Sequence, residues 1–121
     1  MKTVVVFAHG SRDPLWRGPI EAVARAVEAA APGTPVRCAY LELCEPNLPT
    51  AVAELAALGA TVVRVLPVFF GMGRHAREDL PGLLADLATQ HPGVQLAVLP
   101  TVGEDPRVTH LLAQLALEDP T

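Results

Sequence analysis

The sequence predicts an α/β protein, a three-layer sandwich in which helices cover both faces of a four-stranded parallel sheet. Four short apolar segments, rich in β-branched residues, alternate with four longer segments whose apolar residues recur at helical spacing. The first apolar segment, residues 2–8, shows no in-and-out alternation, which is typical of a strand covered on both faces. Because a helix separates each strand from the next, we expect parallel pairing with right-handed crossovers.

The elements follow one another without a linker or a repeat. We expect strands over residues 2–8, 36–41, 61–69 and 94–99. We expect helices over residues 19–31, between an Asn47 cap and Gly59, from about Asp79 to Gln90, and from an Asp105 cap onward, the last with Val108, Leu111, Leu112 and Leu115 on one stripe. Pro19 and Pro106 stand where the first turn of a helix tolerates proline, and Asn47 and Asp105 are good N-caps. The pattern therefore supports three of the four helices by a start signal as well as by their period.

Length and composition predict one domain over residues 1–121 with a substantial core, since half of the residues are hydrophobic. The net charge of −4 and the lack of a basic run argue against nucleic acid as a partner. No apolar stretch approaches the roughly 20 residues that a membrane-spanning helix needs, and residues 2–8 are too short for a signal peptide. We therefore expect no membrane partner and a cytoplasmic location.

The two cysteines, Cys38 and Cys44, are expected to be reduced. Six steps of ~3.3 Å along a strand place them roughly 20 Å apart. A disulfide needs Cα atoms within about 7 Å, so we expect structural thiols.

Candidate functional residues follow three of the predicted strands. His9 comes after the first strand, Glu42 after the second, and His75 after the third. Ligands of open α/β sheets bind beyond the carboxyl ends of the strands, where the strand order reverses. If the order is 2-1-3-4, His9 and His75 flank that point. Gly71 and Gly73, which precede His75, would let the chain turn tightly and leave room for a ligand.

These residue types favour a metal handled beside an anionic small molecule. Two imidazoles and a carboxylate suit a divalent ion such as Co²⁺, Fe²⁺, Ni²⁺ or Zn²⁺. Histidine also accepts protons near neutral pH. Three arginines in or beside the same loops suit a polyanion: Arg12, Arg74 and Arg77. Each residue also has an ordinary structural reading, as a loop histidine, a helix cap or a surface charge.

Four segments, in order, resemble the signature segments of the sirohydrochlorin chelatases, in the short single-domain form of these class II chelatases. They are AHGSRDP (8–14), YLELCEPNL (40–48), LPVFFGMGRHAREDLP (66–81) and VGEDPRV (102–108). The resemblance covers nearly the whole chain. It implies a chelatase-like fold with the flavodoxin-like order 2-1-3-4, and insertion of Co²⁺, or of Fe²⁺, into sirohydrochlorin.

The resemblance also implies roles for individual residues. His9 and His75 match the two active-site histidines of the family, and Glu42 matches an acidic position, so all three are expected to serve as catalytic residues and metal ligands. The expected substrate-binding residues are Ser11, Arg12, Glu45, Phe70, Gly71, Met72, Gly73 and Arg74. Sirohydrochlorin and the divalent metal are the expected partners, with no tightly bound cofactor. The short members resemble half of a two-lobed enzyme, which implies a homodimer, and the apolar segment of Phe69, Phe70 and Met72 near the sheet edge fits a partner surface.

Two other functions remain open at this point. A non-catalytic metal or tetrapyrrole carrier would share the same fold and the same residues. A phosphatase with a histidine nucleophile also has His-Gly after a strand, but its motif places arginine directly before the histidine, where this sequence has Ala8. The same ligands accept Co²⁺, Fe²⁺ and Ni²⁺.

Overall fold

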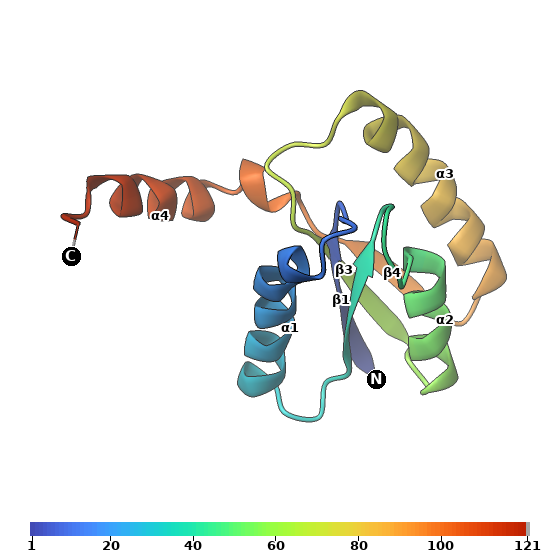
Figure 1. Cartoon of the computed structure of the whole chain (residues 1–121). Coiled ribbons are helices and arrows are strands. Elements are labelled where there is room, and N and C mark those ends of the chain that lie inside the picture. The colour runs from blue at the N-terminus through green and yellow to red at the C-terminus, as the bar shows by residue number, and fades with distance from the viewer. Residues whose placement is uncertain (121) are drawn as a thin grey trace.

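A parallel sheet of four strands forms the middle layer of the computed structural model, which describes residues 1–120 (Figure 1). The strands are β1 (Lys2–Ala8), β2 (Val36–Tyr40), β3 (Val62–Pro67) and β4 (Gln95–Val98). Their order, β2-β1-β3-β4, confirms the predicted order 2-1-3-4. Because β1 lies between β2 and β3, the order of the strands reverses beside its carboxyl end.

Helices cover the two faces of this sheet unequally. Helix α1 (Gly18–Ala30) lies on one face, after a short 3₁₀ helix η1 (Pro14–Arg17), while α2 (Leu48–Ala57) and α3 (Arg74–Gln90) lie on the other (Figure 1). Each face has its own apolar cluster. The first centres on Phe7, Val63 and Val65 under α2 and α3, and the second on Val6 and Ile20 under α1. The three layers predicted from the sequence are therefore present.

Helix α3 begins at Arg74, about five residues before the predicted start at Asp79. Gly73 takes an extended conformation (φ −61°, ψ 163°) as its N-cap, and Arg74 pairs with Glu78 one turn later, at 3.1 Å. Pro81, which we expected near the start, lies inside the helix instead. A proline at this position removes one backbone hydrogen bond of the helix. The turn before it is still stabilised by the Arg74–Glu78 pair and by the hydrogen bond from the Arg77 N–H to the Gly73 carbonyl. His75 consequently belongs to a helix and not to a loop.

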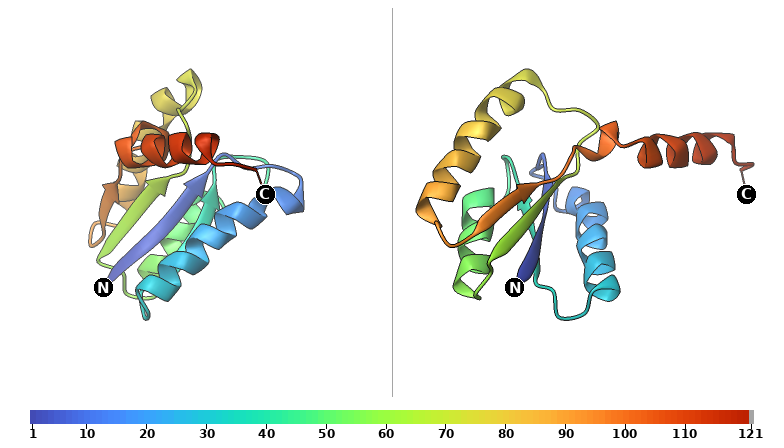
Figure 2. Two further views of the ribbon diagram at one scale, coloured as in Figure 1. Left: turned by 90° about the vertical axis from the view of Figure 1, so that its left-hand side faces the viewer. Right: turned by 180° about the vertical axis from the view of Figure 1, so that it is seen from behind.

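Helix α4 (Pro106–Leu117) does not join either layer. It follows a short 3₁₀ helix, η2 (Val102–Glu104), and points away from the sheet (Figure 2). Its cap is the one predicted: the Asp105 carboxylate accepts a hydrogen bond from the Arg107 N–H at 2.8 Å. No residue of α4 is fully buried: Val108 is half-buried, and Leu111, Leu112 and Leu115 on the same stripe remain exposed.

No helix within residues 1–120 combines the length and the apolar character needed to cross a membrane.

The hydrogen-bond ladder between β1 and β2 continues past the ends of both strands. The Leu41 N–H donates to the Ala8 carbonyl at 2.9 Å, and the Glu42 N–H donates to the His9 carbonyl at 3.0 Å. Gly10 follows with a φ of +111°, and its Cα packs directly against the Glu42 carbonyl, which leaves no room for a Cβ. Glycine is therefore required there by conformation and by space.

We predict that Gly10→Ala destabilises the protein by about 2–3 kcal/mol, because it combines a positive φ with a backbone collision. Chemical denaturation measures this free energy of unfolding. Gly82→Ala is the matched control: Gly82 lies inside α3 with open space where a Cβ would stand, so alanine should stabilise by about 0.5–1 kcal/mol. A Gly10→Ala protein as stable as the parent would show that the contact at Glu42 does not constrain the fold.

Candidate functional site

His9 and Glu42 form a side-chain pair at the carboxyl edge of the sheet. The distance between His9 Nε2 and Glu42 Oε1 is 2.9 Å, and each side chain is a little over half exposed, at 55% and 54%. The two residues are 33 positions apart in sequence, and the extended β1–β2 ladder brings them together. An exposed pair of this kind contributes little to stability, so both groups are accessible to a ligand at small energetic cost.

Phe69 forms the floor beside this pair. Its ring packs edge-on against Phe7, with centroids 5.7 Å apart, and against the His9 imidazole, with centroids 6.4 Å apart. Phe7 is 1% exposed, so the contact joins the site to the core under α2 and α3. This stacking restricts the orientation of the His9 ring, whose Nε2 faces Glu42.

A pocket of about 310 Å³ opens between the ends of β1 and β2 and the first turn of α3. Its lining contains all three residues to which the sequence assigned catalysis, together with parts of the glycine segment: His9, Leu41, Glu42, Phe69, Gly71, Gly73, Arg74, His75 and Ala76. Neither Gly71 nor Gly73 has a positive φ. A Cβ at either position would have no other atom within 4 Å. Their role here is to leave space in the pocket rather than to allow a left-handed turn.

The first turn of α3 brings unpaired backbone donors to this pocket. Gly73 has no side chain to cap the helix, and the first turn holds no acidic residue. The N–H groups at a helix start lack intrahelical partners and carry partial positive charge, which favours an anion. The Arg74 guanidinium adds a full positive charge, although Glu78 pairs with it. This wall of the pocket is therefore suited to a carboxylate.

His75 lines the pocket but stands apart from the His9–Glu42 pair. Within residues 1–120, no three histidine, cysteine, aspartate or glutamate side chains lie close enough together to hold a metal ion. The sequence correctly places the three groups around one pocket. Within one copy of the chain, however, the three side chains of His9, Glu42 and His75 are too far apart to bind one metal ion together.

The other predicted substrate-binding residues divide between this pocket and its surroundings. Ser11 accepts a hydrogen bond from the Asp13 N–H at 3.1 Å and so shapes the loop after β1. Arg12 is exposed in the same loop, and Phe70 is 75% exposed beside the pocket. Met72 packs against the core under α3. Phe70 also contributes to a separate apolar cleft beside α4.

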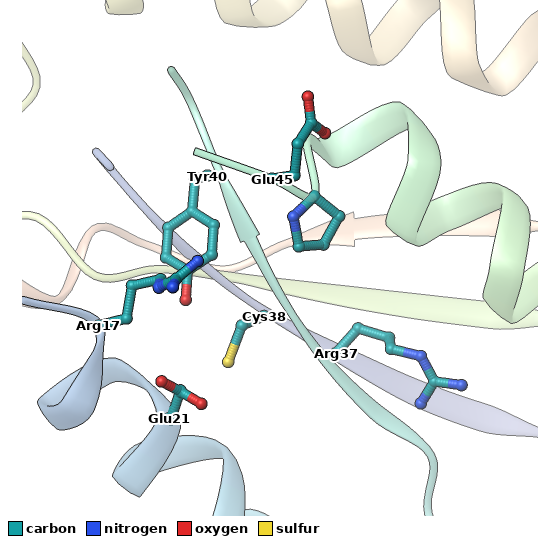
Figure 3. A pocket seen from close by; sticks show the side chains of 7 residues that line it. Arg17, Glu21, Arg37, Cys38, Tyr40 and Glu45 are labelled. Atoms are coloured by element: carbon teal, nitrogen blue, oxygen red, sulfur yellow. The ribbon is translucent and has the colours of Figure 1, made fainter. Parts of the chain in front are cut away.

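Glu45 lies in a different and larger pocket of about 410 Å³, on the α1 side of edge strand β2 (Figure 3). Arg17, Glu21, Cys38 and Tyr40 share this pocket, and Arg37 points away from them toward Glu54, with which it pairs at 3.1 Å. Its charges are mixed and its lining contains no histidine. We place the functional site at the smaller pocket, because that one has the groups for metal and proton chemistry.

Burial raises the pKa of two residues of the larger pocket, Tyr40 and Cys38. It raises the pKa of Tyr40 to about 12, and it raises the pKa of the Cys38 thiol. Cys38 and Cys44 are both free, as the sequence predicts. A half-buried thiol with a raised pKa is a poor nucleophile, so Cys38 acts as a structural residue.

Sequence reasoning missed two residues that shape the site. Gly10 was read as part of a motif and not as the point where β1 and β2 approach each other. Phe69 was interpreted as a core or dimer residue; it does pack against the core, and its ring also supports His9, which the sequence did not indicate. The sequence did indicate that Gly10 is special, because a His-Gly pair follows a buried strand. Only the register of β1 and β2, however, shows that Gly10 packs against Glu42.

Comparison with known proteins places these features in context. The family model described as CbiX matches residues 3–119. A relative from Methanopyrus kandleri named sirohydrochlorin cobaltochelatase is 38% identical over 84 residues, which are 69% of this chain and 59% of the relative. This chain thus spans little more than half the length of that relative.

Solved structures agree with the fold. A CbiX protein from Marinobacter aquaeolei VT8, described as a putative cobalamin biosynthesis protein, has a TM-score of 0.82 at 29% identity, over 96% of this chain and 94% of that one. The sirohydrochlorin chelatase SirB from Bacillus subtilis subspecies spizizenii, solved in complex with cobalt, has a TM-score of 0.74 at 26% identity. That match covers 95% of this chain and 51% of SirB.

We predict that Tyr40 titrates near pH 12 in the folded protein and near pH 10 in denaturant. The chain has a single tyrosine, so its ultraviolet absorbance reports this group alone. Because folding raises the pKa, the stability that Tyr40 contributes is complete below pH 10 and is lost as the pH rises toward 12. Tyr40→Phe should abolish the absorbance step. A folded-state midpoint at pH 10 would contradict the burial of the phenol.

Proposed function

The chain belongs to the CbiX family, and we propose that it is a sirohydrochlorin chelatase that inserts a divalent metal into the tetrapyrrole. Co²⁺ is the proposed metal, because the M. kandleri relative is named a cobaltochelatase and SirB was solved with cobalt. Fe²⁺ is the alternative substrate. The reaction belongs to cobalamin or siroheme biosynthesis, and we propose a cytoplasmic location for it.

The His9–Glu42 pair is the observation that carries this proposal. Imidazole nitrogen and carboxylate oxygen are both ligands of divalent cobalt and iron. A metal held by only two protein ligands keeps its remaining coordination positions for water molecules. The pyrrole nitrogens can then replace this water as the metal enters the ring. A closed cage of four protein ligands would retain the metal instead of transferring it. The pair therefore suits an ion that passes through the site.

His75 supplies a further group on the α3 side of the same pocket. Insertion of the metal releases two pyrrole N–H protons, and each must reach a base. A macrocycle bound between the sheet edge and α3 would contact His9 and Glu42 on the side of β1 and β2, and His75 on the side of α3. We propose that one histidine binds the metal while the other accepts the two protons one after the other and passes each to bulk water.

The remaining wall of the pocket suits the periphery of the ring. Sirohydrochlorin carries eight carboxylates, which Arg74 and the uncapped start of α3 would attract. Arg12 lies on the loop after β1 and adds a second exposed cation. The Phe69 ring, with Phe70 exposed next to it, supplies apolar area for the face of the macrocycle.

We propose a homodimer as the active form. At about 310 Å³, the pocket is at the lower end of the range for ligand sites, roughly 300–1,000 Å³, and it is too small to enclose a tetrapyrrole. A second copy would supply the missing wall. The exposed Phe70 lies beside the pocket and fits such an interface.

A non-catalytic carrier is the alternative function, and turnover distinguishes the two. A carrier would bind Co²⁺ and sirohydrochlorin without releasing metallated product. The phosphatase alternative loses support from the structure. Ala8 occupies the place of the required arginine and is 1% exposed, so it offers nothing to a phosphate.

We predict that His9→Ala and His75→Ala each lower the rate of Co²⁺ insertion by about 100-fold or more, through loss of a ligand or a proton acceptor. Absorbance of the tetrapyrrole follows the insertion, after subtraction of the non-enzymatic rate. The fold should persist in both variants, because both side chains are exposed.

His91→Ala is the control, since His91 ends α3 far along the helix from the pocket. Its insertion rate should match the parent. Full activity in either pocket variant would remove that histidine from the mechanism. Stoichiometric binding without turnover in the parent would favour the carrier.

A further inference from the structure

The larger pocket beside β2 has no part in the proposed reaction, yet it has the size of a ligand site. Its volume of about 410 Å³ exceeds that of the smaller pocket and falls within the range of roughly 300–1,000 Å³ for small-molecule sites. Tyr40 and Pro46 contribute apolar surface, and Arg17 and Glu21 stand beside it from the start of α1 (Figure 3). An apolar lining with a few charged groups is the usual composition of a small-molecule site.

Arg17 stands where a cation is unfavourable. It is the N-cap of α1, and the start of a helix is the positive end of the helix dipole. The residue is half-buried, and its guanidinium makes no ion pair within residues 1–120. Glu21 follows four positions later, the spacing at which helix neighbours usually pair, but the two side chains do not meet. An unpaired guanidinium in a pocket is suited to the carboxylate of a ligand.

Two carboxylates supply the opposite charge in the same pocket. Glu21 belongs to α1 and Glu45 to the loop after β2, and neither pairs with a basic side chain in the part of the chain that the structure describes. The other arginine of the pocket, Arg37, does not neutralise them, because it pairs with Glu54 at 3.1 Å. The pocket therefore suits a ligand that carries both an anion and a cation.

The main chain of β2 adds a donor and an acceptor at this place. Because β2 is an edge strand, every second residue directs its N–H and C=O away from the sheet. The Tyr40 N–H donates to the Pro46 carbonyl at 2.9 Å, and the Val36 carbonyl accepts from the Arg37 guanidinium at 3.0 Å. Cys38 lies midway between Val36 and Tyr40, so its N–H and C=O point outward as well, and no strand is there to pair with them.

This open edge has the length of a single residue. A peptide that added a strand to β2 would also need the Val36 carbonyl and the Tyr40 N–H, which the chain itself already occupies. One free amino acid needs only the main-chain groups of Cys38. The Tyr40 phenol, with a pKa of about 12, stays protonated at neutral pH and remains a hydrogen-bond donor in the pocket.

We propose that the larger pocket binds one free α-amino acid with an apolar side chain, in its zwitterionic form. The carboxylate of the ligand pairs with Arg17, its ammonium group pairs with Glu21, and its side chain lies against Tyr40 and Pro46. This site is independent of the proposed reaction, because none of these residues lines the smaller pocket.

Amide NMR of the ¹⁵N-labelled chain, titrated with L-leucine in metal-free buffer, tests the site and the class of ligand together. The expected result is a set of saturable shifts that are largest at Cys38 and its neighbours in the larger pocket. N-acetyl-L-leucine lacks the ammonium group and L-leucine methyl ester lacks the carboxylate. Each should bind about tenfold more weakly or worse, because each leaves one charged group of the pocket unpaired.

Three results of this titration would overturn the proposal. The first is the absence of saturable shifts with L-leucine up to about 10 mM. The second is equal binding of L-leucine and both blocked probes, which would indicate peptide-like pairing with the edge strand instead of recognition of a zwitterion. The third is a set of shifts centred on His9 and Glu42, which would place the ligand in the smaller pocket.

Variants of the two charged residues test the same pairing from the side of the protein. Arg17→Gln and Glu21→Gln should each weaken L-leucine binding by about tenfold or more, with an otherwise unchanged amide spectrum. Arg25→Gln is the matched control: Arg25 is exposed on the same helix and does not line the pocket, so its loss should leave the affinity unchanged. Parent affinity in both pocket variants would overturn the assignment.

Discussion

The structure depends on one local constraint, the close approach of the chain after β1 to the chain after β2. The ladder continues through the hydrogen bond from the Glu42 N–H to the His9 carbonyl, and Gly10 allows the Glu42 carbonyl to lie against its Cα. This backbone contact places the two side chains of the site 2.9 Å apart. Main-chain pairing therefore sets the geometry of the site. The His9 and Glu42 side chains remain free to give up their contact with each other and bind a ligand instead.

The rest of the site is arranged around this contact by segments that follow β3. Phe69 packs between Phe7 of the core and His9 of the site, so the buried cluster supports the imidazole directly. The open space beside Gly71 and Gly73 separates that floor from the start of α3, where His75 and Arg74 line the pocket. A rigid pair on the sheet thus faces a helix end that carries the third group, an arrangement suited to a flat ligand between them.

Local sequence signals predicted the strands and the Asn47 and Asp105 caps, because these depend on short-range patterns of apolar residues, prolines and N-cap side chains, whereas the strand order was implied by the resemblance to the chelatase family. The same signals placed His9, Glu42 and His75 around one pocket, since strand ends meet at one edge of a parallel sheet. They misplaced the start of α3, where Gly73 and the Arg74–Glu78 pair outweigh Pro81 as a boundary. They did not predict the direction of α4, because a tertiary contact between Gly103 and Phe70 determines it.

Anomalous diffraction from crystals of the chain soaked in Co²⁺ tests the central claim most directly, because it locates the ion without relying on turnover. The account predicts a cobalt peak at about 2.0–2.2 Å from His9 Nε2, with the Glu42 carboxylate as a neighbouring ligand and the direct 2.9 Å contact between the two side chains replaced by bonds to the metal. A peak only at other residues at saturating Co²⁺, with the His9–Glu42 contact intact, would contradict it.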